Sequence, residues 1–135
     1  MVKKNVRVTR EAIEKLSREL KLLEPDEFSQ DWQYEVADLN RLEEFVMFYF
    51  DEKLNNNEKF TLMNLILESA NDCVQSESLN CKTWEQIAKI LTYDIDINEQ
   101  ILEYWACGDD KIEDCFYITP LIRKIKEKLT TEINK

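Results

Sequence analysis

The sequence predicts an all-α protein, a compact antiparallel bundle of five to six helices in a single domain over residues 1–135. Glycine is almost absent: the chain has one glycine and two prolines, whereas tight β-turns depend on glycine for positive φ angles. Apolar residues recur at intervals of three and four, as they do on one face of a helix. They make up 44% of the chain, which is enough for a globular core.

The first third of the chain predicts two helices separated by a connector. Thr9 can cap a helix that runs to about Leu23 and ends before Pro25, and residues 1–8 are expected to form a loose basic arm. Residues 26–37 are expected to be a connector with aromatic anchors. Asp38 is the expected cap of a helix over 39–54, and the apolar run at 45–50 makes this helix the expected centre of the bundle.

Four more helices follow, joined by short polar segments. The expected caps are Asn57 for a helix over 58–74, and Thr83, in a capping box with Gln86, for the next one. A further helix is expected to begin at Asp96 and to be closed by Gly108. After an acidic segment over 109–118, Thr119 and Pro120 predict the start of a last helix that reaches about residue 131.

Several kinds of chemistry are unexpected in this chain. It has no histidine, which excludes Ser-His and Cys-His nucleophile pairs and histidine-bearing metal sites. Its cysteines, at positions 73, 81, 107 and 115, are too widely spaced for the usual zinc-ligand pairs. We expect ordinary reduced thiols, with two disulfides or a metal site as alternatives. No catalytic residue, cofactor or metal is predicted, and the protein is expected not to be an enzyme.

The N-terminal residues and the hydropathy pattern predict a cytoplasmic protein. Met1 leads into a charged helix, not into the apolar stretch of a signal peptide. The longest apolar run, residues 45–50, is far shorter than the roughly 20 residues that a membrane-spanning helix needs.

Charge is sorted along the chain. Residues 1–24 and 120–135 are each net +3, whereas residues 25–119 are net −16, for a total of −10. Such a negative middle attracts cationic partners and repels nucleic acid and anionic membranes. The sequence therefore predicts a basic protein partner, with no nucleic acid and no membrane.

Acidic and aromatic residues alternate in two segments, 26–52 and 94–114 with its flanks. Aromatic anchors among charges are typical of protein interfaces, because rings supply buried area and charges speed the encounter. The contact surface predicted from these segments consists of Asp31, Trp32, Tyr34, Glu35 and Asp38, together with Asp109, Asp110, Glu113 and Asp114.

In charge, size and fold class the chain resembles the immunity proteins, the small acidic helical inhibitors that neutralise basic nuclease toxins in bacteria. This resemblance involves no motif and assigns no residue a role; it implies a cytoplasmic inhibitor or adaptor that docks a basic partner.

Two alternatives remain open from the sequence. The first is a magnesium-dependent nucleotide hydrolase: Glu11 with Glu14, and Glu35 with Asp38, match the Glu-x-x-Glu and Glu-x-x-Asp pairs of all-α nucleoside-triphosphate pyrophosphatases by letter. The second is a homo-oligomeric structural or regulatory protein that buries the aromatic residues of 45–50 between subunits.

Overall fold

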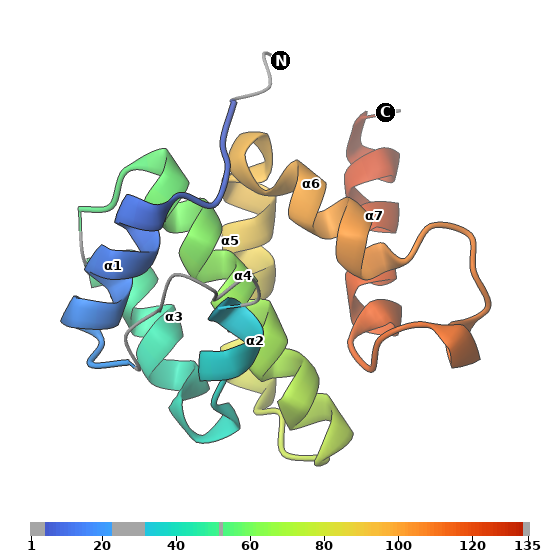
Figure 1. The fold of residues 1–135 in the computed structure, drawn as a ribbon. Coiled ribbons are helices and arrows are strands. Elements are labelled where there is room, and N and C mark those ends of the chain that lie inside the picture. Colours follow the sequence, from blue (N-terminus) through green and yellow to red (C-terminus); the bar gives the residue numbers. More distant parts are fainter. Residues whose placement is uncertain (1–4, 23–31, 52, 134–135) are drawn as a thin grey trace.

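The computed structural model describes residues 5–22, 32–51 and 53–133, and all regular elements in these ranges are helical (Figure 1). The α-helices are α1 (Arg10–Glu19), α2 (Trp32–Val36), α3 (Leu42–Asp51), α4 (Asn56–Gln75), α5 (Cys81–Tyr93), α6 (Ile95–Ala106) and α7 (Thr119–Ile133). Two 3₁₀ turns, η1 (Leu39–Arg41) and η2 (Ile112–Asp114), complete the described part. The predicted all-α fold is thus confirmed.

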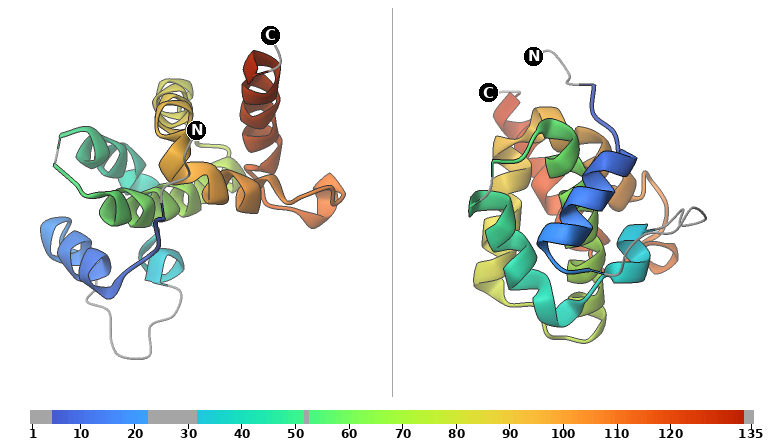
Figure 2. Two further views of the ribbon diagram at one scale, coloured as in Figure 1. Left: turned by 90° about the horizontal axis from the view of Figure 1, so that it is seen from above. Right: turned by 60° about the vertical axis from the view of Figure 1, so that its left-hand side comes forward.

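Helix α4 is the centre of the molecule. Buried side chains occupy nearly all of its positions from 60 to 70, so the helix is covered around its whole circumference. Helices α1, α2, α3 and α6 pack directly on it, whereas α7 lies at the edge of the molecule against α5 and α6 (Figures 1 and 2).

The prediction that the helix containing 45–50 is central was wrong. Helix α3 buries Phe45, Val46 and Tyr49, but Met47 and Phe50 are about half exposed. Side chains spaced by three and four residues share one face of a helix, and only that face of α3 meets the core.

Helix caps were predicted with mixed success. The Thr9 hydroxyl accepts a hydrogen bond from the Ala12 amide at the start of α1, and the Asp38 carboxylate accepts one from the Asn40 amide at η1. Asn57 and Thr83, in contrast, are not caps, and both lie inside helices. The caps are Asn55, which forms a reciprocal capping box with Glu58, and Asn80. Three asparagines, at 55–57, span the start of α4, and both Asn80 and Thr83 near the start of α5 are good capping residues, so composition alone could not choose the capping position.

Helix ends also differ from the predictions. Helix α1 ends at Glu19, and α6 starts directly after Asp94 rather than at Asp96. The predicted connector over 26–37 contains the short helix α2, while its residues 26–31 lie outside the described residues.

Both basic ends of the chain contact the acidic middle. The Lys15 ammonium lies 3.1 Å from the Glu58 carboxylate of α4, and the Lys126 ammonium lies 2.9 Å from that of Glu103 on α6. The described part of the predicted loose arm, residues 5–8, is also anchored: Val6 is buried, and the Arg7 amide donates a hydrogen bond to the Asn57 side chain. Among the described residues, none of the helices combines the length and apolarity that crossing a membrane requires.

Candidate functional site: an acidic disulfide loop

The predicted contact residue Trp32 is part of the core. Its side chain is 1% exposed, and its indole N–H donates a hydrogen bond of 3.1 Å to the Ser17 hydroxyl on α1. Placing Trp32 on the surface was therefore wrong. The residue lies on the face of α2 that meets the core, and this helix was not recognised in the sequence because it is only five residues long.

The other residues of the first predicted group differ in their exposure. Tyr34 is 72% exposed and Glu35 is also exposed, so both are available to a partner. The carboxylate of Asp38 is engaged as the cap of η1, and the residue is half-buried. Asp31 lies outside the described residues.

The second predicted group lies on one connection between two helices. We call residues 107–118, between α6 and α7, the acidic loop; it lies at the right-hand edge of the molecule in Figure 1. Helix α6 ends where Cys107 adopts a left-handed conformation (φ 66°), followed by Gly108 in the same region (φ 55°). These two residues reverse the chain direction, and glycine adopts such a φ without the steric cost of a side chain.

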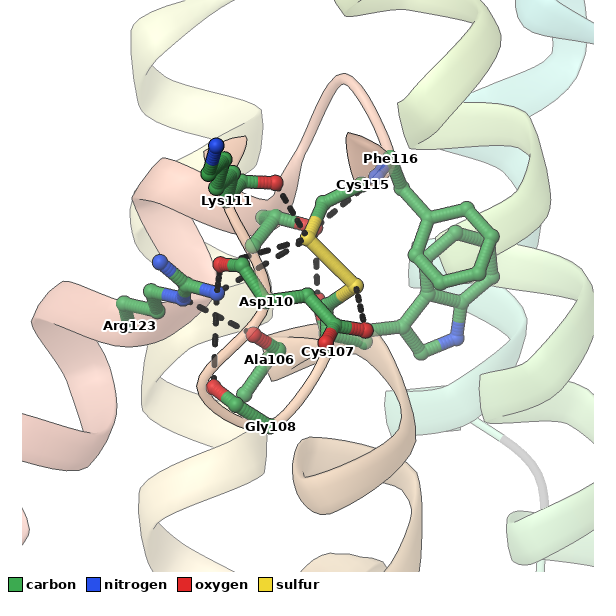
Figure 3. Close-up of a disulfide and its surroundings, with 10 residues drawn as sticks. Ala106, Cys107, Gly108, Asp110, Lys111, Cys115, Phe116 and Arg123 are labelled. Atoms are coloured by element: carbon green, nitrogen blue, oxygen red, sulfur yellow. Dashed lines mark hydrogen bonds between the residues drawn. A yellow bond between two sulfur atoms is a disulfide. The ribbon is translucent and has the colours of Figure 1, made fainter. Parts of the chain in front are cut away.

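A disulfide between Cys107 and Cys115 closes this loop, with their Cα atoms 6.0 Å apart (Figure 3). Inside the loop lies the guanidinium of Arg123 from α7. It donates hydrogen bonds to the carbonyl oxygens of Ala106 (2.8 Å), Gly108 (3.3 Å) and Asp110 (2.8 Å). The last carbonyl groups of a helix have no partner within the helix, so Arg123 satisfies the end of α6 and fixes the first half of the loop.

The second half of the loop is fixed by the start of α7. The Thr119 hydroxyl donates to the Trp105 carbonyl oxygen and accepts from the Phe116 amide. The Ile118 amide donates to the Asn71 side chain of α4. The ring of Phe116 packs on Trp105, with centroids 4.5 Å apart. Both ends of the loop are therefore attached to the helical core.

The tip of the loop carries the negative charge. Asp109, Asp110, Glu113 and Asp114 are all exposed, and with Lys111 they give residues 109–114 a net charge of −3. Three exposed apolar side chains accompany them: Ile112 in the tip, Tyr117 after it, and Tyr104 on the last turns of α6. The loop thus combines fixed backbone, negative charge and exposed rings.

The prediction of four reduced thiols was wrong for one pair of cysteines. Cys107 and Cys115 are bonded, whereas Cys73 and Cys81 are free. Burial raises the pKa of the Cys73 thiol, which favours its unreactive neutral form. Stable disulfides are typical of oxidising compartments, so the bond weighs against the predicted cytoplasmic location, which stays a prediction.

The described parts of the two predicted acidic groups contact α4 on different sides. The Asp38 amide is bound by Ser69, and the Ile118 amide by Asn71. These two α4 residues are two positions apart, or about 200° around the helix. Residues 36–38 and the acidic loop therefore reach α4 from different sides, as the views from the front and from above also show (Figures 1 and 2).

The hydrolase alternative requires several carboxylates that converge on one metal ion. In the described ranges, no group of three or more acidic or cysteine side chains is placed to hold a metal. Glu11, Glu14 and Glu35 are exposed, Glu14 is paired with Arg10, and Asp38 caps η1.

Comparisons with known proteins add no assignment: no protein family, no curated protein and no solved structure matches this chain.

Residues outside the predicted contact set complete the loop: the disulfide cysteines, which were expected to be reduced, Arg123, and the exposed side chains of Tyr104, Ile112 and Tyr117. The two cysteines on either side of a glycine-containing acidic run were a usable signal, because a short loop places such thiols close together. No sequence signal pointed to Arg123, which looks like one of several cations on α7.

Proposed function

We propose that this protein is a non-catalytic binding module that docks a basic protein through its acidic loop. The single observation that carries the proposal is the loop itself, in which four exposed carboxylates and exposed apolar side chains are held on a covalently closed backbone. An ordered loop loses less conformational entropy on binding than a mobile one, so more of its contact energy contributes to affinity.

The charge of the loop suits a basic partner and a fast encounter. At a separation of about 6 Å in water, each charge pair contributes about 0.7 kcal/mol. Because solvent screening reduces this further at an exposed surface, the four carboxylates together contribute about tenfold to the association rate, more at low salt. The most concrete form of the proposal is inhibition, in which the loop covers a basic functional surface of the partner.

The experiment compares two variants of equal charge. In the loop variant, Asp109→Asn, Asp110→Asn, Glu113→Gln and Asp114→Asn remove four charges. In the control variant, four exposed carboxylates outside the loop are removed by Glu11→Gln, Glu77→Gln, Glu85→Gln and Glu127→Gln. A partner captured by the wild-type protein from its source cell is purified, and the association rate constant is measured for each variant.

We expect the association rate constant of the loop variant to be about tenfold lower than that of the wild type at low salt. The association rate constant of the control variant should fall much less. Equal losses in both variants would show that net charge alone attracts the partner. If every captured partner binds the loop variant as well as the wild type, the proposal is wrong.

The homo-oligomer alternative has less support. Of the run at 45–50, Phe45, Val46 and Tyr49 are already in the core, which leaves Met47 and Phe50 as its clearly exposed members.

A further inference from the structure

A second surface, unrelated to the acidic loop, lies along α5. A hollow of about 250 Å³ between α5 and α7 is lined by the apolar parts of Ala88, Tyr93, Ile125 and Leu129. A neighbouring hollow of about 320 Å³ is lined by Tyr49, Phe50, Ile90 and Tyr93. Lys89 and Tyr93 of α5 line both hollows and stand between them, so the two hollows lie side by side along α5; together they are called the α5 groove.

The α5 groove presents apolar surface that nothing in the described part of the chain covers. The Tyr93 side chain is 86% exposed at the end of α5, and Phe50 of α3 is 54% exposed. Single exposed apolar residues are common on proteins, but here two exposed rings border hollows whose walls are also apolar. Exposed rings beside hollows with apolar walls offer anchor points for the apolar side chains of a partner.

Lysines surround this apolar surface. Lys59 of α4, Lys89 of α5 and Lys128 of α7 line the two hollows. The Lys59 ammonium lies 5.9 Å from the centre of the Tyr49 ring. Among the described residues, Asp94 supplies the one carboxylate that lines the groove, and this carboxylate accepts a hydrogen bond of 2.7 Å from the Tyr49 hydroxyl. The groove is therefore locally positive in a chain of net charge −10.

We propose that the α5 groove binds an amphipathic helix of another protein that has acidic residues on both borders of its apolar face. An apolar groove between helices accepts such a face through anchors spaced by three and four residues. Carboxylates at its borders would meet Lys59 on the α4 side and Lys128 on the α7 side, with Lys89 between these two lysines. A basic helix is the worse match, because it would place cations against these three lysines.

A second copy of this chain is the less favoured occupant. Two molecules of net charge −10 repel each other at long range, whereas a short acidic helix carries fewer charges to the encounter. The groove is also separate from the acidic loop, which precedes α7, whereas Lys128 and Leu129 lie in the second half of that helix.

The test uses a labelled synthetic helix of about 18 residues, long enough for five turns, with leucines along one face and glutamates on both borders. A control peptide has lysine in place of each glutamate. Binding to the full chain is followed by fluorescence anisotropy, and the contacted residues are identified from amide chemical shifts. The groove variants are Lys89→Glu with Lys128→Glu, and Tyr93→Ala. The matched control, Lys21→Glu with Lys82→Glu, changes the net charge equally at exposed sites outside the groove.

We expect the glutamate-bordered helix to bind with a Kd in the micromolar range, about tenfold weaker in either groove variant and nearly unchanged in the control. The amide chemical shifts that change on peptide binding should be those of Lys89, Tyr93, Lys128 and their neighbours. Circular dichroism of each variant shows whether it is folded, and all the substituted side chains are exposed or line the groove.

Several outcomes would overturn the proposal. They are no saturable binding of the glutamate-bordered helix, equal binding of the lysine-bordered control, or shift changes away from the groove. Dimerisation of the wild type that Tyr93→Ala abolishes would assign the groove to a second copy. Flotation with phosphatidylglycerol vesicles that depends on Lys89 and Lys128, without peptide binding, would assign it to anionic lipid.

Discussion

Removing the disulfide of the acidic loop should destabilise the protein measurably. The double variant Cys107→Ser, Cys115→Ser opens a loop whose ends are eight residues apart in sequence. In the chain-entropy description, the bond restricts the unfolded chain, and a loop of this size corresponds to about 2.5 kcal/mol. The entropy of unfolding per residue is about 2.1 cal/mol/K, so for 135 residues this loss lowers Tm by about 9 °C.

Thiol titration and denaturation together provide the assay. Without reductant, the denatured wild-type protein should show two reactive thiols, those of Cys73 and Cys81, and after reduction it should show four. Urea unfolding then compares the wild type, the double variant and Cys81→Ala, whose exposed side chain contributes little.

Hydrogen bonds to the two ends of the loop limit the loss of stability in the double variant. Arg123 and Thr119 still hold its ends when the covalent bond is absent, so the double variant should stay folded. Four reactive thiols in the unreduced protein, or an unchanged urea midpoint in the double variant, would refute the reasoning.

Three further predictions concern the core and the pH dependence of stability. Trp32→Phe should cost about 2–3 kcal/mol in urea unfolding, because it leaves a cavity and a buried Ser17 hydroxyl without its donor; a cost below 0.5 kcal/mol would contradict the buried assignment. Tyr34→Ala, on the same helix but exposed, should change stability by less than about 0.5 kcal/mol. Burial, together with the hydrogen bond to Asp94, raises the pKa of Tyr49 far above the ordinary value of 10.0. The folded state therefore keeps this proton where the unfolded state loses it, so stability is complete below pH 10 and falls as the pH rises above it. The free energy of unfolding, measured between neutral and alkaline pH, should fall with pH in the wild type and fall less steeply in Tyr49→Phe. An equal pH dependence in the two proteins would contradict this role of Tyr49.

The sequence predicted the fold class well because the information for it is local. Helical periodicity and caps such as Thr9 depend on neighbouring residues, and glycine scarcity is a property of composition that involves no contact between distant residues. The central helix was misassigned because centrality is not local. The run at 45–50 is the most apolar in the chain, yet the covered helix is α4, whose apolar residues are spread over all its faces between polar ones.

Only part of the candidate site could be predicted, because only part of it depends on local sequence. The exposed acids of the loop follow from their own chemistry, since four carboxylates in six residues are rarely buried. The burial of Trp32 depends on Ser17, fifteen residues earlier, and the fixed backbone of the loop depends on Arg123 and Asn71 in other helices. Such contacts between distant residues leave no pattern in a single sequence.

The net charge of a segment also does not show where its charged side chains lie in the structure. The C-terminal segment looks like one basic patch of +3 in the sequence, but α7 distributes its cations among different tasks. Arg123 donates to carbonyl groups of the acidic loop, Lys126 pairs with Glu103, and Lys128 borders the α5 groove. Residues 123 and 128 are five positions apart, about 140° around the helix after a full turn, so one short basic segment supports both a negative and a positive surface. A charge sum can therefore predict the sign of the overall field, while the surfaces that partners meet depend on which way each helix turns its side chains.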